Sequence, residues 1–149
     1  MAGTSDFELV RWSQGKVRHN FLRSDGNTNA QASPERLRVM FVVGLIADLE
    51  YSTRATAKAT TRSTYGVTVA QRAADVAQRL FDLQQKIQDR HVQRVLEAFA
   101  QVELRTNNEL ALTAAADQIQ SAGRQFAAAN DGSQLTAIDP LLPAPSQYR

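Results

Sequence analysis

A seven-residue repeat between Val69 and His91 constrains the fold more than any other stretch of the sequence. Its three blocks begin at Gln71, Gln78 and Gln85 and read QRAADVA, QRLFDLQ and QKIQDRH. Apolar residues recur in them at alternating three- and four-residue spacing, which is the spacing of a seam along one face of a helix. The large seam residues are Val76, Leu80, Leu83 and Ile87. The repeat therefore predicts a long helix that buries this seam against another helix.

The seam needs a partner helix, and the repeat leaves open whose helix that is. We expect self-association of the chain through the seam, and the alternative is cover by the other helices of the same chain. Each block also has a base at its second position and an acid at its fifth. These charges form ladders of i,i+3 and i,i+4 pairs, each worth about 0.2–0.5 kcal/mol. The ladder accounts for Asp75, Asp82 and Asp89 without any catalytic role.

Capping signals divide the rest of the chain into further helices. Ser33-Pro34-Glu35 combines an N-cap serine, a proline at the first helical position and an acid in the first turn. Capping-box spacing recurs at Thr68–Gln71 and Thr106–Glu109, while Gly66 and residues 130–132 supply stop signals. The pattern predicts an all-α, coiled-coil-like bundle of three long helices. They are expected over residues 34–64, 68–105 and 107–129.

Two arms flank this predicted helical domain of residues 34–130. Residues 1–33 predict either a hairpin that turns near Gly15 or an extended arm. Residues 131–149 contain three of the four prolines, which disfavour a helix and predict an extended tail. Both arms contain more large apolar side chains than a solvated arm would, so we expect them to contact neighbouring subunits. The expected arm contacts are Phe7, Trp12, Phe21, Leu141 and Leu142.

The segment Val39–Ala47 is nine uncharged residues without a polar face. A membrane-spanning helix needs about 20 apolar residues, and Asp48 and Glu50 close this run far short of that length. We expect a helix buried on most of its sides. The alternative is a patch that faces a membrane surface or a partner.

Three bases recur every four residues in the first predicted helix, at Arg54, Lys58 and Arg62, and would share one helical face. A solvated face is the simpler interpretation. The alternative is contact with nucleic acid, together with bases of the N-terminal arm. Those arm bases are Arg11, Lys16, Arg18 and Arg23. A net charge of only +2 argues against a nucleic-acid footprint.

The sequence predicts no catalytic site, metal site or cofactor. There is no cysteine, the two histidines lie far apart, and no glycine-rich phosphate loop or nucleophile motif is present. Asp48 and Glu50 stand at i,i+2, so they would not face each other on a helix. The N-terminus lacks the pattern of a secretory signal peptide, which favours a location in the cytoplasm or in a virion.

These features favour a non-catalytic structural subunit of a large homo-oligomeric assembly, held by long helices and strapping arms. A virion (that of a bacteriophage included), a tail or a secretion filament is the kind of assembly expected. Its partners would be copies of itself and other assembly proteins. One alternative is a helical protein that packages or binds nucleic acid through the basic face. A second is a membrane-associated helical protein that uses residues 39–47.

Overall fold

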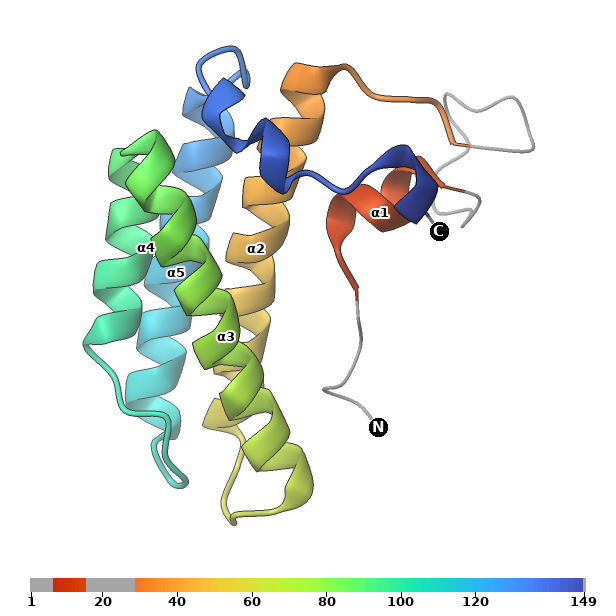
Figure 1. Ribbon diagram of the computed structural model, residues 1–149. Helices are drawn as coiled ribbons and strands as arrows, with labels where there is room; N and C mark the ends of the chain where they lie inside the picture. The colour runs from red at the N-terminus through yellow and green to blue at the C-terminus, as the bar shows by residue number, and fades with distance from the viewer. Residues whose placement is uncertain (1–6, 16–28, 149) are drawn as a thin grey trace.

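The computed structural model describes residues 7–15 and 29–148, and this part of the chain is mostly helical and contains no strand. The elements are α1 (Leu9–Gln14), α2 (Pro34–Ala57), α3 (Thr64–Ile87), α4 (Arg90–Ala100), α5 (Glu109–Ala129) and two short 3-10 turns, η1 (Thr136–Leu141) and η2 (Pro145–Gln147). The four long helices run alternately down and up (Figure 1). Helix α2 packs against both α3 and α5, and α4 packs mainly against α5.

Helix α2 begins as predicted, with the Ser33 hydroxyl accepting a hydrogen bond from the Arg36 amide at 3.3 Å. It ends at Ala57, and the prediction that it continues to residue 64 is wrong. The reason is a second cap, because the Ser63 hydroxyl accepts from the Gly66 amide at 3.2 Å and starts α3 at Thr64. Gly66 therefore lies in the first turn of α3 and is not a helix stop.

The predicted helix over residues 68–105 is two helices. Gln88 adopts the left-handed conformation, with φ 49° and ψ 42°, and ends α3. The Asp89 carboxylate then caps α4 by accepting from the amides of His91 and Val92 at 2.7 and 3.1 Å. The heptad pattern fails at the same place, where Arg90 occupies a seam position. The bundle consequently has four long helices where three were expected.

Helix α5 agrees with the third predicted helix to within two residues at its start. It packs closely on α2 at Gly123, where an added Cβ atom would lie 2.7 Å from Cγ2 of Ile46. The predicted capping box before it does not form, since the N-cap is Asn108 and its side chain makes no capping hydrogen bond. The small residues of the α5 seam thus set the distance between the two helices.

The heptad seam is buried within the chain. Val76, Leu80 and Leu83 belong to the core, and Ile87 packs partly buried at its edge. Much of the apolar run is also in this core, at Phe41, Val42, Leu45 and Ile46. Helix α2 is the main neighbour of α3 and covers most of the seam. This is the alternative in which other helices of the same chain cover the seam. The run at residues 39–47 is a core helix as expected, and no helix among the described residues is long and apolar enough to span a bilayer.

Both arms contribute to the same core in their described parts. Residues 9–14 form helix α1 where a hairpin strand or an extended arm was predicted, and Val10 is fully buried. The second strand of the predicted hairpin lies outside the described residues. The tail forms two 3-10 turns where an extended chain was predicted, and Ile138 is fully buried. A 3-10 turn this short accommodates Pro140, because few backbone amides have to donate within it.

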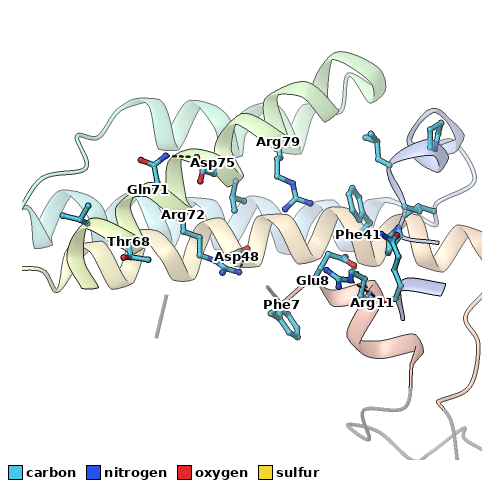
Figure 2. Close-up of a pocket in the computed structure, with 17 residues that line it drawn as sticks. Phe7, Glu8, Arg11, Phe41, Asp48, Thr68, Gln71, Arg72, Asp75 and Arg79 are labelled. Carbon is cyan, nitrogen blue, oxygen red and sulfur yellow. Dashed lines mark hydrogen bonds and ion pairs between the residues drawn. The ribbon is translucent and has the colours of Figure 1, made fainter. Parts of the chain in front are cut away.

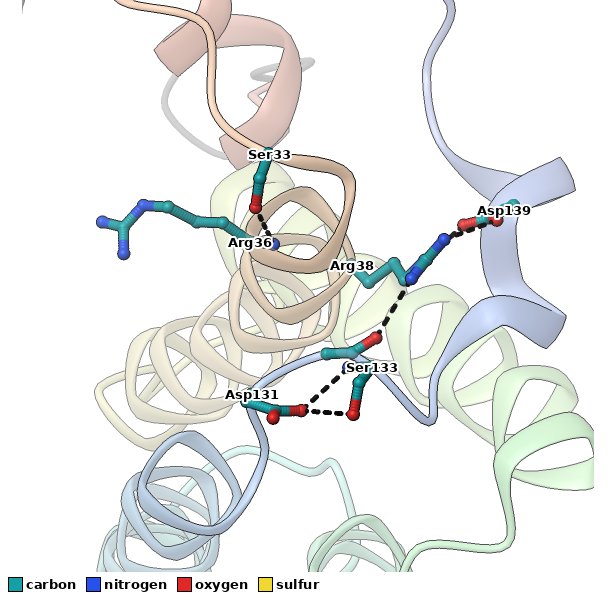
Figure 3. Close-up of polar contacts among 7 residues, drawn as sticks. Ser33, Arg36, Arg38, Asp131, Ser133 and Asp139 are labelled. Atoms are coloured by element: carbon teal, nitrogen blue, oxygen red, sulfur yellow. Dashed lines mark hydrogen bonds and ion pairs between the residues drawn. The ribbon is translucent and has the colours of Figure 1, made fainter.

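An ion pair ties the tail to the start of α2 (Figure 3). Arg38 binds Asp139 through two nitrogens of its guanidinium, Nε to Oδ1 at 2.6 Å and Nη2 to Oδ2 at 2.8 Å. Its Nη1 donates to the carbonyl of Gly132 at 3.2 Å. This hydrogen bonding lowers the pKa of the Asp139 carboxyl. The turn at Gly132 has φ +91° and passes so close to α2 that an added Cβ would lie 2.1 Å from the Glu35 carbonyl oxygen.

Candidate functional site

The arms and the bundle together enclose an open groove of about 930 Å³ (Figure 2). Helix α3 forms one wall, and the segment entering α1 forms the other. Phe41 of α2 and Val76 of α3 lie at its floor, and the proline-flanked end of η1 closes it. The groove is therefore lined by four segments that lie far from one another in the sequence. The tail reaches this position because the Arg38–Asp139 pair holds η1 against α2.

An ion pair spans the groove between its two long helices. The Arg72 guanidinium of α3 binds the Asp48 carboxylate of α2, with Nε to Oδ1 at 2.6 Å and Nη2 to Oδ2 at 2.8 Å. The Ser52 hydroxyl also donates to Asp48 Oδ1 at 3.2 Å. The hydrogen bond to Asp48 raises the pKa of Arg72. Asp48 thus fastens α2 to α3, a role that its place beside the apolar run did not reveal.

Arg79 lies one heptad after Arg72 and has no such partner among the described residues. Its side chain extends from α3 across the groove toward Phe41 (Figure 2). It forms no hydrogen bond or ion pair with any residue in the described part of the chain. Its neighbour Asp75 instead accepts a hydrogen bond from the Gln71 side-chain amide at 2.8 Å. The described residues of the groove therefore leave this cation unpaired above an apolar floor.

Several of the exposed large hydrophobic residues of the protein line the groove. Seven large hydrophobic residues are exposed in the described chain, and three of them line this groove. They are Phe7, Val67 and Leu141, at 43%, 51% and 40% exposure. A groove lined by exposed apolar side chains from three separate segments is suited to binding.

Most of the predicted arm contacts meet at this groove. Phe7, Leu141 and Leu142 line it, and the Trp12 ring packs against Phe7 with 5.7 Å between ring centroids. Phe21 lies outside the described residues. The two arms also contact each other, because Arg11 Nε donates to the carbonyl of Gln147 at 3.3 Å. The side chains predicted as arm contacts therefore lie close to one groove, and in this structure they contact the bundle of their own chain.

The three bases of the predicted basic face do not share one helix. Arg54 binds Glu50 at 2.9 Å and Asp117 at 2.8 Å, and Lys58 is bound to Glu109. Arg62 lies in the loop after α2, because the helix ends before reaching it. A continuous basic stripe along α2 is therefore a wrong prediction. The pairing of Arg54 with Glu50 could have been read from their i,i+4 spacing.

Titratable side chains also lie outside the groove in the described part of the chain, among them buried His91. Among the described residues, no group of three or more histidine, cysteine, aspartate or glutamate side chains could hold a metal ion. His91 is buried at the start of α4, where its Nε2 accepts from Arg90 Nε at 3.2 Å and its Nδ1 has no hydrogen-bond partner among those residues. It does not line the groove. The groove combines apolar contact with charged side chains, of which Arg79 has no hydrogen-bond or ion-pair partner among the described residues.

Comparison with protein-family models, with curated proteins and with solved structures finds no match for this chain.

Proposed function

We propose that the protein is a non-catalytic structural subunit of a homo-oligomeric assembly, of the virion, tail or secretion-filament type. The observation that carries the proposal is that exposed Phe7, Val67 and Leu141 line one groove. Exposed large apolar side chains that line one groove favour a contact site with another protein. The cation of Arg79 within it supplies the polar specificity that such a contact needs.

The arms would act through their outer faces. Their inner faces are already occupied, because Val10 and Ile138 are fully buried in the core of the same chain. Phe7 and Leu141 remain exposed on the same two segments. A neighbouring subunit would therefore bind α1 and η1 in positions that the core of their own chain already fixes, which lowers the entropy cost of the contact.

A compact single-chain binding module is the second candidate. Burial of Val10 and Ile138 in the core of their own chain favours it, since arms used as straps would present such side chains to neighbours. The groove would then hold a segment of a different protein. Nucleic-acid packaging is a weaker alternative, because acids of the same chain already bind Arg54 and Lys58. Membrane association through residues 39–47 is also weaker, since much of that run lies in the core.

Light scattering across a range of protein and salt concentrations tests the proposal. We expect a mass well above the 16.4 kDa of one chain, rising with protein concentration. A truncation after Leu142 removes η2 and its contact with α1, so it should weaken assembly while leaving the helical circular dichroism of the bundle intact. A matched control is Arg124→Glu, which changes an exposed residue of α5 outside the groove. A mass of one chain at every concentration would overturn the assembly and favour the binding module. Binding to DNA with a steep salt dependence would instead favour nucleic-acid packaging.

A further inference from the structure

A second exposed apolar surface lies at the start of α5. Leu110 is 86% exposed, the highest value of any large hydrophobic residue in the described chain. Ala111 and Ala114 are also exposed and share its side of the helix, because residues one, three and four apart cluster on a helical face. We call Leu110, Ala111 and Ala114 the α5 knob. A leucine this exposed buries little of its side chain in its own fold.

The knob and the groove lie on different sides of the molecule. No residue of α5 lines the groove, which is built from α1, α2, α3 and the tail. In Figure 1 the start of α5 lies at the lower end of the bundle, and α1 lies on the opposite flank. A chain therefore cannot place its own knob in its own groove.

The two surfaces are complementary in polarity and charge. The groove is lined by exposed Phe7, Val67 and Leu141 and by the cation of Arg79. The groove acids Glu8 and Asp75 already accept hydrogen bonds within the chain, from backbone amides of α1 and from the Gln71 side chain. The knob carries the carboxylate of Glu109 directly beside Leu110. Glu109 is bound by Lys58, and both side chains are more than half exposed. An exposed pair of this kind contributes little to stability, so its carboxylate can turn to a new cation at small cost.

We infer that the groove receives the α5 knob of a second copy of this chain, with Leu110 against the apolar floor and Glu109 beside Arg79. This inference rests on the proposed function and names the contact that builds the assembly. Each copy has one knob and one groove on different sides, so the contact is heterologous. Such contacts repeat from subunit to subunit and produce rings or open filaments.

Two single variants, studied alone and mixed, test this contact. Leu110→Asp damages the knob and leaves the groove intact, while Arg79→Glu damages the groove and leaves the knob intact. Both positions are solvent-exposed, so each variant should keep the circular dichroism and unfolding temperature of the wild type. We expect each variant alone to sediment as a monomer at concentrations where the wild type forms species larger than dimers. An equimolar mixture should recover dimers and nothing larger, because only one intact knob and one intact groove can meet.

Matched controls change similar residues outside both surfaces. Phe81→Asp introduces an acid at an exposed aromatic of α3, and Arg124→Glu reverses a charge on α5. Both should assemble like the wild type. If the wild type assembles but Leu110→Asp and Arg79→Glu assemble equally well, the contact is wrong and the proposed function survives. The contact is also wrong if the mixture stays monomeric. If the wild type is a monomer at every concentration, both the contact and the proposed function are wrong.

Discussion

Replacing Ile138 by alanine tests whether the tail is part of the fold or a strap for neighbours. Ile138 lies in η1, outside the four long helices, and is fully buried. The substitution removes three carbon atoms, each worth about 0.8 kcal/mol of apolar burial, which is about 2.4 kcal/mol. The cavity left behind adds to this, and isoleucine-to-alanine changes in cores cost about 2–5 kcal/mol in total. We expect about 3 kcal/mol, because a turn at the edge of the bundle can collapse partly into the space.

The assay is urea unfolding followed by circular dichroism, with thermal unfolding as a second measurement. For a chain of this size, about 3 kcal/mol corresponds to a fall of about 6–12 °C in Tm. Leu141→Ala is the matched control, since Leu141 lies in the same turn and is 40% exposed. It should lower the free energy of unfolding by clearly less, about 1–1.5 kcal/mol, because its side chain is only partly buried. If Ile138→Ala cost no more than Leu141→Ala, the tail would not be part of the core.

Three further predictions concern single residues of the fold. Asp139→Asn should lower the urea midpoint at neutral pH. Arg38 lowers the pKa of Asp139 in the folded state, so the ion pair stabilises the folded protein at pH values above the unfolded pKa of about 3.9. This contribution is lost as pH falls through the lowered pKa, so the gap between variant and wild type should close below about pH 4. It should stay constant between about pH 5 and 7. Gly132→Ala should destabilise the protein by at least about 1–3 kcal/mol in urea unfolding, since its φ of +91° and the nearby Glu35 carbonyl leave no room for a Cβ. Gln88→Gly should raise Tm, because the left-handed conformation there strains a side chain by about 1 kcal/mol and suits glycine. An unchanged or lower Tm would contradict this.

The helical class and the core faces could be predicted because they depend on local periodicity. Spacing predicts the seam at Leu80 and Leu83, and an uninterrupted run of uncharged residues predicts the buried helix that begins near Val39; residues of both pack in the core. A helix end was harder to predict where two nearby residues could each serve as the N-cap of the same helix. Ser63 and Thr68 both have capping side chains, and the structure uses Ser63, while the Thr68 hydroxyl bonds back to the carbonyl of Thr64 at 2.8 Å. Nothing local in the sequence ranks one cap above the other.

The groove could not be predicted, because it depends on where distant segments meet. One wall includes the residues that lead into α1. Helix α1 packs closely on α2 because Gly44 has no side chain, and a Cβ atom there would lie 2.8 Å from the Cβ of Leu9. Its far end requires Asp139 to find Arg38, a residue 101 positions earlier in the chain. Proline content described the tail as extended, but burial of Ile138 outweighed that tendency. Tertiary contacts of this kind leave no periodic signal in either arm.

The heptad register explains why Arg79 is left without a partner among the described residues. Helices α2 and α3 run antiparallel, so a step of seven residues forward on α3 matches a step of seven backward on α2. Arg72 faces Asp48, and the same step leads from Arg72 to Arg79 and from Asp48 to Phe41. An acid at position 41 would have repeated the ion pair and closed the groove with a second bridge. The chain instead places an aromatic ring there and keeps the arginine. The ion pair between α2 and α3 is thus not repeated one heptad further on, and Arg79 keeps its charge without a partner among the described residues. Phe41 and Arg79 together therefore provide the apolar floor and the cation that a neighbouring subunit would meet.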